Sequence, residues 1–284
     1  MHSYKTLLEY GVKRLEDAGI HESVTDAWFL FEYIFEISKA EYYMNPEQSV
    51  ESDKESAYMI GLNKRVNHIP LQHITGKQEF MGLEIEVNEH VLIPRQDTEQ
   101  LVEYALDRLK HAANLENFKV LDMCTGSGCI AISLAKLGGV RQITGVDISN
   151  NALTTAKRNA KNNGVEYIKW ICSNLFEMVE GKFDMIISNP PYIPTEEIDG
   201  LMEEVKCHDP KIALDGKEDG LFYYQKITET SKLFLEENGL LLYEIGYNQG
   251  EAVKGILLQH GFVDVEVYKD LSGLDRVVVG KRSI

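Results

Sequence analysis

Residues 120–131 read Val120-Leu121-Asp122-Met123-Cys124-Thr125-Gly126-Ser127-Gly128-Cys129-Ile130-Ala131. A short apolar strand is followed by an acidic residue and then by a loop of small residues that opens a helical pattern. Glycines at a strand-to-helix turn let the backbone approach a ligand closely, and the free N–H groups at the helix start face that ligand. The stretch therefore predicts an α/β fold with a cofactor at this turn. Taken alone, the Gly-x-Gly-x-x-Ala spacing suits a dinucleotide equally well.

Two acidic residues narrow the choice of cofactor. Asp122, just ahead of the glycine loop, would repel a pyrophosphate but attract a cationic sulfonium cofactor that carries an amino group. Asp147 ends the next apolar strand, residues 142–147, where it is placed to accept both hydroxyls of a ribose. That role is shared by nicotinamide and S-adenosylmethionine enzymes, so it indicates a nucleoside cofactor without choosing between them. The alternative for Asp147 is an N-cap of a helix that begins near Ser149.

A second loop, Asn189-Pro190-Pro191-Tyr192, stops the apolar strand at residues 183–188. Proline fixes its own φ and restricts the residue before it, so the loop is rigid and the Asn189 side chain has few directions to point. The Asn189 side-chain oxygen and the Pro190 carbonyl can accept the two hydrogens of one NH2 group, and Tyr192 supplies a flat apolar face. The loop therefore predicts a site for a planar amide or amino nitrogen. The alternative is an ordinary turn that ends the strand.

The order of the predicted elements indicates two parts. Apolar residues at helical spacing predict helices over residues 4–15, 24–35 and 52–66, with a capping box of Ser52 and Glu55 opening the last of them. From about residue 97 helices and strands alternate, which predicts a mostly parallel sheet covered on both faces. The loop before the last strand is too short for a crossover helix, so that strand runs antiparallel. The expected strands lie at residues 118–122, 142–147, 166–171, 183–188, 239–245, 262–268 and 275–280.

The composition of the chain narrows its expected cellular compartment and its expected binding partners. The chain has 284 residues, 44% of them hydrophobic, which suffices for one large domain and a smaller one. No apolar run is long enough to span a bilayer and the N-terminus lacks signal-peptide features, so we expect a cytoplasmic protein without a membrane partner. The cysteines and histidines lack the spacing of metal sites, so no metal is predicted. The formal net charge of −16 disfavours DNA as a partner, because phosphate neutralisation drives most of the affinity for DNA.

The glycine loop, Asp147 and the Asn-Pro-Pro-Tyr loop together resemble those of class I S-adenosylmethionine-dependent methyltransferases, and specifically of the protein-(glutamine-N5) methyltransferases that modify peptide-chain release factors. Three further stretches are similar to that family rather than to methyltransferases at large. Residues 70–83 resemble its interdomain segment, 91–99 its Ile-Pro-Arg-Pro-Glu-Thr-Glu signature, and 209–221 its Glu-Pro…Ala-Leu…Gly…Asp-Gly pattern. The resemblance covers nearly the whole chain.

The resemblance implies a Rossmann-like fold with a mostly parallel seven-stranded sheet and a small N-terminal helical bundle. The expected parts are a helical substrate-recognition domain at residues 1–70, a connector with a β-hairpin at 71–96, and the methyltransferase domain at 97–284. Alternating apolar residues from Phe80 to Val87 also predict that hairpin.

The resemblance also implies an activity, the transfer of a methyl group from S-adenosylmethionine to the side-chain amide nitrogen of the glutamine in the Gly-Gly-Gln motif of release factors, which leaves S-adenosylhomocysteine. The implied catalytic residues are Asn189, Pro190, Pro191 and Tyr192. The implied cofactor-binding residues are Asp122, Cys124, Thr125, Gly126, Ser127, Gly128, Asp147, Asn174, Leu175 and Asn189. The chain departs from the family pattern at residues 96–97 and at Asp209. It also departs at residues 173–176, where the family often has an acidic and an aromatic residue. There Asn174 would bond the adenine edge and Leu175 would pack on its face.

Two other functions stay open. DNA amino-methyltransferases that act on adenine N6 or cytosine N4 carry a similar Asn/Asp-Pro-Pro-aromatic loop, although the acidic net charge argues against DNA. A cofactor-binding regulatory protein without turnover would use the acidic surface and the bundle as an interaction platform. For the enzyme, we expect release factors as protein partners, no direct nucleic-acid contact and a monomer.

Overall fold

The computed structural model describes residues 2–112 and 114–283, and these fall into two compact units. The first unit runs to Gly76 and also contains Met202–His208, and the second holds Lys77–Leu201 and the chain from Asp209 onward. The first unit therefore continues past the expected end at residue 70. It also includes a segment that was expected within the methyltransferase domain.

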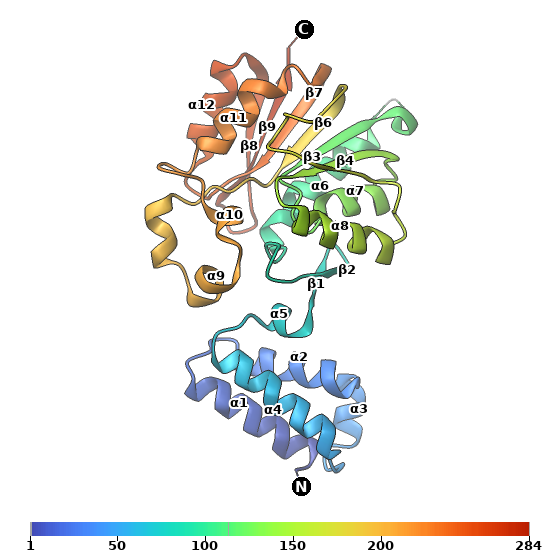
Figure 1. The fold of residues 1–284 in the computed structure, drawn as a ribbon, viewed down its shortest axis with the longest axis vertical. Helices are drawn as coiled ribbons and strands as arrows, with labels where there is room; N and C mark the ends of the chain where they lie inside the picture. The colour runs from blue at the N-terminus through green and yellow to red at the C-terminus, as the bar shows by residue number, and fades with distance from the viewer. Residues whose placement is uncertain (1, 113, 284) are drawn as a thin grey trace. The chain divides into compact units, whose positions relative to one another are not determined.

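Helices make up the first unit. The long helices α1 (Tyr4–Asp17), α2 (Ser23–Phe35) and α4 (Ser52–Val66) pack around one apolar core, at the blue end of the colour scale in Figure 1. Three short helices complete the unit: α3 (Lys39–Met44), α5 (Leu71–Thr75) and α9 (Glu203–His208). The three long helices predicted from the apolar spacing are confirmed. No helix in the part of the chain that the structure describes is long and apolar enough to cross a membrane.

The predicted capping box at the start of α4 is wrong. Ser52 already lies inside the helix, and the N-cap is Glu51, whose side chain makes no capping hydrogen bond. The Glu55 carboxylate instead contacts His2 Nδ1 at 2.7 Å. A Ser-x-x-Glu spacing forms a capping box only where the serine lies in extended backbone just outside the first turn, and here the helix begins one residue too early.

A seven-stranded sheet forms the centre of the second unit. Its strand order is β5-β4-β3-β6-β7-β9-β8, parallel from β5 to β7, with β9 antiparallel to both β7 and β8. This arrangement confirms the prediction of a mostly parallel sheet with an antiparallel last strand. The strands are β3 (Lys119–Met123), β4 (Gln142–Asp147), β5 (Lys169–Cys172), β6 (Phe183–Ser188), β7 (Leu235–Glu244), β8 (Phe262–Lys269) and β9 (Asp275–Arg282).

Helices cover both faces of the sheet (Figure 1). The apolar side chains of α6 (Gln96–Lys110), α7 (Cys129–Lys136) and α8 (Asn150–Asn162) are buried on one face. Those of α11 (Phe222–Ser231) and α12 (Gly250–Gln259) are buried on the other. Successive residues of β3 enter different cores, Val120 the first and Leu121 the second, because side chains along a strand point alternately to opposite faces.

The connector contains an antiparallel hairpin, β1 (Lys77–Phe80) paired with β2 (Leu83–Glu86). The turn residues Met81 and Gly82 have φ values of 53° and 71°. Phe80 and Ile85 are buried in the core that also contains residues of α6 and α7, so the hairpin belongs to the second unit.

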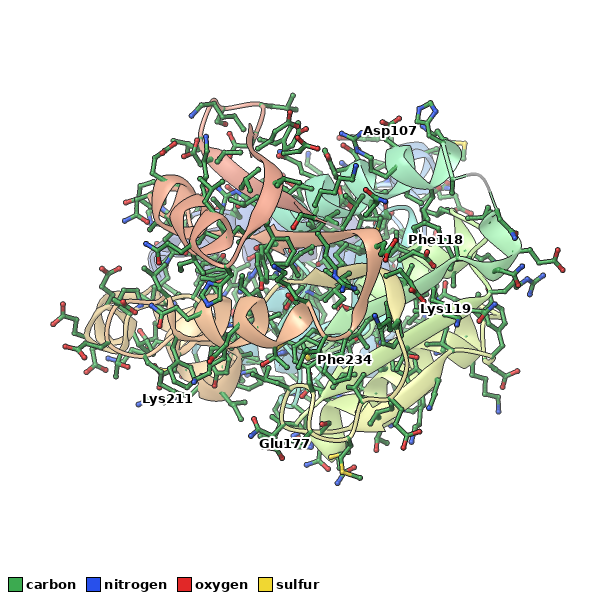
Figure 2. All side chains as sticks on the ribbon, turned by 90° about the horizontal axis from the view of Figure 1, so that it is seen from above. Asp107, Phe118, Lys119, Glu177, Lys211 and Phe234 are labelled. Atoms are coloured by element: carbon green, nitrogen blue, oxygen red, sulfur yellow. The ribbon has the colours of Figure 1, made fainter. Side chains whose placement is uncertain are left out.

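The loops that concern function leave the sheet at the carboxyl ends of its parallel strands, opposite the edge where these strands begin. Figure 2 labels the amino ends of two of these strands: Phe118 and Lys119, where β3 begins, to the right of the centre, and Phe234, just before β7, near the centre. The carboxyl ends of the parallel strands lie at the other edge. In open α/β sheets, ligands bind at the carboxyl edge of the parallel strands.

Candidate active site

A cavity opens at the carboxyl edge of the sheet, within the second unit. It is lined by the segment before α6, by the loops after β3, β4, β5 and β6, and by the segment around α10 (Lys211–Leu214). Segments far apart in the sequence therefore meet at one place. The predicted site residues that line the cavity are Cys124, Thr125, Gly126, Ser127, Asp147, Asn174, Leu175, Asn189 and Pro191.

The two glycines of the loop after β3 have different surroundings. Both lie in the left-handed region, with φ of 55° at Gly126 and 80° at Gly128. A Cβ added at Gly126 would meet no atom within 4 Å, so this backbone borders open space and lets a ligand approach. A Cβ added at Gly128 would lie 2.9 Å from Trp170 and 3.0 Å from Ala156. Gly128 does not line the cavity and packs closely at the start of α7, so its cofactor contact stays a prediction.

Asp122 is enclosed beneath the loop and does not line the cavity. Its Oδ2 accepts hydrogen bonds from the Thr125 hydroxyl at 2.5 Å and from the Ala131 N–H at 3.2 Å. Burial raises the pKa of this carboxyl to about 7. Asp122 does not line the cavity, and its contact with the cofactor stays a prediction. Its carboxylate joins the glycine loop to the first turn of α7, and so it shapes the loop that the cofactor would meet.

Asp147 lies at the cavity and organises the backbone around it. Its Oδ2 accepts from the Gly126 N–H and its Oδ1 from the Ser149 N–H, both at 2.9 Å. Burial raises the pKa of Asp147, and these hydrogen bonds lower it in part. The N-cap of α8 is Ser149, whose hydroxyl accepts from the Ala152 N–H at 3.2 Å, so the capping alternative for Asp147 is wrong. The ribose contact stays a prediction.

The loop after β5 supplies the residues expected to hold adenine. Asn174 and Leu175 both line the cavity, and Asn174 Nδ2 donates to Glu177 Oε1 at 2.7 Å. The one aromatic residue of this segment, Phe176, is buried and stacks on Phe234, with ring centroids 4.8 Å apart and planes inclined by 20°. Its ring is therefore committed to the core, and the apolar side chain left at the cavity is Leu175. Both adenine contacts stay predictions.

Asn189 follows β6 and its side chain is fixed at one end. The Ser188 hydroxyl donates to the Met123 carbonyl at 2.6 Å, which joins the ends of β6 and β3. Asn189 Nδ2 donates to Thr98 Oγ1 at 3.1 Å, and both residues line the cavity. Because the amino end of the carboxamide is held by Thr98, Oδ1 is the end left for a ligand.

The other three residues of the Asn-Pro-Pro-Tyr loop differ in position. Pro190 and Pro191 are both buried, but only Pro191 lines the cavity. Tyr192 is absent from the cavity lining, and its hydroxyl donates to Glu244 Oε1 at 3.4 Å. Burial raises the pKa of Tyr192, so it remains a neutral phenol. The catalytic roles of Pro190 and Tyr192 stay predictions.

A second segment holds the Asn-Pro-Pro-Tyr loop in place. Ile193 N–H donates to the Leu214 carbonyl at 3.0 Å, and Gly216 N–H donates to the Ile193 carbonyl at 2.8 Å. A Cβ added at Gly216 would lie 2.7 Å from the backbone of Tyr192, and one added at Gly220 only 2.3 Å from its carbonyl oxygen. The Ala-Leu…Gly…Asp-Gly pattern seen in the sequence thus corresponds to a segment that needs glycine where it meets this loop.

The thiols at the cavity do not form a metal site. Cys124 and Cys129 both line it, and burial raises the pKa of each, that of Cys129 to about 12. Among the described residues, no group of three or more His, Cys, Asp or Glu side chains could hold a metal ion. These cysteines serve as small neutral residues around the glycine loop.

Several residues at the site were not predicted from the sequence. Thr98 and Glu244 contact residues of the Asn-Pro-Pro-Tyr loop. Arg95, by contrast, lies in the stretch 91–99 that resembles the family signature, and its Nη2 pairs with the enclosed carboxylate of Asp209 at 2.5 Å. The aspartate at this departure from the family pattern is therefore paired with an arginine. Glu244 could have been noticed as an acidic residue at the end of an apolar strand. Its contact with Tyr192 could not, because Tyr192 lies on a distant segment of the chain.

Comparisons with known proteins agree on one family. Models of the PrmC N-terminal domain and of the Methyltransferase small domain match residues 6–76 and 102–205. A release factor glutamine methyltransferase of Agrobacterium fabrum is 39% identical over 272 residues, covering 95% of this chain and 94% of that protein. One of Clostridium acetobutylicum is 40% identical over 262 residues, which is 90% of each chain. The solved ribosomal protein L11 methylase of Lactobacillus delbrueckii subsp. bulgaricus has a similar fold, with a TM-score of 0.51 and 23% identity over 70% of this chain and 86% of that one.

Proposed function

The chain belongs to the release factor glutamine methyltransferase family, and we propose that the cavity at the carboxyl edge of its sheet is where the methyl group is transferred. The protein transfers a methyl group from S-adenosylmethionine to the side-chain amide nitrogen of a release-factor glutamine. The observation that carries the site is that Asn189 lines the same cavity as Gly126 and Asp147. The relatives do not favour the DNA amino-methyltransferase alternative.

The residues at the cavity fit this cofactor. S-adenosylmethionine supplies an electrophilic methyl group on a cationic sulfur and leaves as S-adenosylhomocysteine. Gly126 offers backbone beside open space, where no side chain blocks the approach of the cofactor. Asp147 accepts the ribose hydroxyls, since each of its oxygens has a lone pair beyond the one used by the backbone. Asn174 bonds the adenine edge and Leu175 packs on its face.

The Asn-Pro-Pro-Tyr loop activates the substrate amide. An amide nitrogen is a poor nucleophile because its lone pair is delocalised into the carbonyl, so it must be oriented and polarised. Asn189 Oδ1 and the Pro190 carbonyl accept its two N–H hydrogens, which aims the lone pair at the methyl carbon. As the N–C bond forms and the S–C bond breaks, positive charge develops on the nitrogen, and these two acceptors stabilise it. The methylated nitrogen then releases one proton to water, so no strong general base is needed.

Tyr192 completes this site by covering the amide plane, and Pro191 keeps the loop stiff. The geometry supports a neutral, anchored tyrosine, because its hydroxyl is held by Glu244 and its carbonyl accepts from Gln249 Nε2 at 2.9 Å. A ring whose hydroxyl is held and whose backbone is anchored can present one face to a planar group and exclude water from it.

We propose the following substrate and setting, which the resemblance to the family implies. The glutamine is that of the Gly-Gly-Gln motif, the partners are release factors, and the enzyme works as a cytoplasmic monomer without direct contact to nucleic acid. The net charge of −16 supports the last point. An assay with radiolabelled S-adenosylmethionine and, separately, release factor, duplex DNA or no substrate tests the function. Label in the release factor alone is expected, and label in DNA or in neither contradicts the proposal.

Replacing Asp147 tests the cofactor contact. Asp147→Ala is expected to weaken cofactor binding by about 1.5 to 3 kcal/mol, because two ribose hydroxyls lose a charged acceptor. The methylation rate at saturating cofactor should hardly change. Isothermal titration with S-adenosylhomocysteine measures the affinity, and an unchanged value would mean that Asp147 only organises the backbone.

Removing the helical bundle tests its proposed role in holding the release factor. A chain that begins at Lys77 retains every residue that lines the cavity, so its cofactor affinity should be kept. Its kcat/KM on intact release factor should fall about tenfold or more, mainly through KM, because the lost contacts are remote from the reacting nitrogen. A short Gly-Gly-Gln peptide serves as the matched substrate and should be methylated equally by both chains. Parental kcat/KM on the intact release factor would exclude a substrate-holding role.

A further inference from the structure

Gln249 reaches the Asn-Pro-Pro-Tyr loop from a distant part of the chain. It is the N-cap residue of α12, yet its side chain makes no capping hydrogen bond there. The short polar residues that usually occupy this position would cap the helix. Gln249 is only 8% exposed, and its side chain turns instead to Tyr192, whose carbonyl accepts from Nε2 at 2.9 Å. The side chain therefore holds the loop rather than the helix.

The turn before α12 holds Gln249 on two sides. The Gln249 N–H donates to the Gly246 carbonyl at 2.9 Å, and the Val253 N–H donates to the Gln249 carbonyl at 2.9 Å. The Gly246 N–H in turn donates to Gln249 Oε1 at 3.0 Å. The backbone and the acceptor end of the side-chain amide are thus fixed to one short turn, and the donor end is the part that reaches the loop.

The two ends of the Gln249 amide cannot be exchanged. A backbone N–H only donates a hydrogen bond, and a backbone carbonyl only accepts one. Oε1 must therefore face the Gly246 N–H and Nε2 must face the Tyr192 carbonyl. The reverse orientation would set donor against donor and acceptor against acceptor, and the N–H of the buried Gly246 would lose its partner. The direction of this contact follows from the backbone groups alone.

The contact between Gln249 and Tyr192 leaves no room for a further side chain. A Cβ added at Gly220 would lie 2.7 Å from Gln249 Nε2 and would also meet the Tyr192 carbonyl oxygen. Gly220 has a φ of 73°, which glycine adopts without strain. The segment that packs on the loop is therefore built so that Nε2 can reach the carbonyl.

The Asn-Pro-Pro-Tyr loop depends on anchors at its ends. Its two prolines have no N–H with which to bond a neighbouring segment. At the first residue, the Asn189 side chain donates to Thr98, and at the last residue, the Tyr192 carbonyl accepts from Gln249. Because proline also fixes φ, two anchored ends leave the Pro190 carbonyl few directions to point.

We propose that Gln249 is a positioning residue for methyl transfer, because its side-chain amide fixes the end of the Asn-Pro-Pro-Tyr loop. Without this hydrogen bond the peptide group after Tyr192 is free to turn, and the Pro190 carbonyl and the Tyr192 ring lose their alignment with the substrate amide. Gln249 does not line the cavity, so it acts through the loop. The inference rests on the proposed role of this loop in activating the glutamine amide.

The first test separates kcat from binding. Gln249→Ala removes the amide and should lower kcat at least about fivefold at saturating substrates, since a displacement of about 1 Å in a positioned group can cost about 100-fold. The KM for release factor should change less than about threefold, because the lost bond is not a substrate contact. The affinity for S-adenosylhomocysteine in isothermal titration should also be kept, because every residue that lines the cavity is unchanged.

Gly246→Ala disturbs the same amide from the other side. A Cβ at this position would lie 2.9 Å from Gln249 Oε1 and 3.1 Å from Cδ, and the three atoms nearest to it all belong to the Gln249 side chain. Gly246→Ala should lower kcat at least about threefold in the parent protein but less than about twofold in a Gln249→Ala background. A change that acts through the Gln249 side chain has nothing left to displace there.

A matched control is Thr228→Val on α11, which removes a fully buried threonine hydroxyl bonded to the Tyr243 hydroxyl at 3.0 Å. It should unfold at a lower temperature than the parent protein and yet keep the parental kcat. This control separates a loss of stability from a misplaced loop.

The proposal is overturned if Gln249→Ala loses less than about fivefold in kcat, or if cofactor affinity falls in parallel with kcat. It is also overturned if Gly246→Ala lowers kcat equally with and without the Gln249 side chain. Should Gln249→Ala not fold, Gly246→Ala decides alone: parental kcat, or a joint loss of kcat and cofactor affinity, overturns the proposal. Failure of the proposed function would be distinct, since the parent protein itself would not methylate a release factor.

Discussion

Asn189→Ala is expected to lower the methylation rate by roughly two to three orders of magnitude, the scale observed when one group that stabilises transition-state charge is removed. Asn189 is the residue of the Asn-Pro-Pro-Tyr loop whose side chain lines the cavity with an acceptor atom left for a ligand. The affinity for S-adenosylhomocysteine should stay within a few-fold of the parental value, because Gly126 and Asp147 are unchanged. Single-turnover kinetics and isothermal titration measure the two quantities separately.

A suitable control for this variant is Asn114→Ala, which removes an asparagine side chain that caps η1 (Leu115–Asn117), ahead of β3 and away from the cavity. It should methylate at the parental rate. Equal losses of cofactor affinity and rate in Asn189→Ala would make Asn189 mainly a cofactor contact, and the amide cradle would have to be abandoned.

Gly216→Ala should reduce kcat by about 100-fold, although Gly216 contacts no reacting atom. A Cβ at this position would lie 2.7 Å from both Cα and C of Tyr192, which are backbone atoms and can move only if the Asn-Pro-Pro-Tyr loop moves. A displacement of about 1 Å in a positioned catalytic group can cost about 100-fold in rate. Steady-state kinetics with release factor, together with thermal unfolding, would separate a misplaced loop from a general loss of folded protein.

Gly255→Ala provides the comparison for this change. Gly255 lies within α12, and a Cβ there would meet no atom within 4 Å, so the variant should be fully active and slightly more stable. If Gly216→Ala were as active as Gly255→Ala, the close approach of Gly216 to Tyr192 would not be what holds the loop.

The sequence predicted those parts of the site that are formed by residues close together in a single segment of the chain. The strand, glycine loop and helix around Gly126, the acid at Asp147 and the rigid loop at Asn189 each have a local pattern, and all three reach the same cavity. The sheet followed from the alternation of helices and strands, because parallel strands need crossover helices.

Where a side chain points depends on neighbours that no local pattern reveals. Asp122 belongs to the cofactor loop in the sequence, yet its side chain turns inward to Thr125. Thr98 lies in the stretch 91–99 that resembles the family signature, but the sequence predicted no separate role for it. Its importance arises from a contact with Asn189, which lies 91 residues further along the chain.

The exact division of the chain into two units also could not be predicted from the sequence. Met202–His208 lies inside the methyltransferase stretch of the chain, but it belongs to the helical unit. One reason is Arg65 of α4, which is almost fully buried and pairs with Asp26 at 2.6 Å and with Glu204 of α9. A buried arginine requires such partners, and a pairing between residues this distant in sequence leaves no local signal.

The most direct test of the amide cradle is a crystal structure of the enzyme with S-adenosylhomocysteine and a peptide containing Gly-Gly-Gln. The account predicts that the side-chain amide nitrogen of the glutamine lies within about 3.2 Å of both Asn189 Oδ1 and the Pro190 carbonyl oxygen, the range of N–H···O hydrogen bonds. Its lone pair should point toward the sulfur of S-adenosylhomocysteine. A glutamine amide held by other groups, or facing the Nδ2 end of Asn189, would contradict the account.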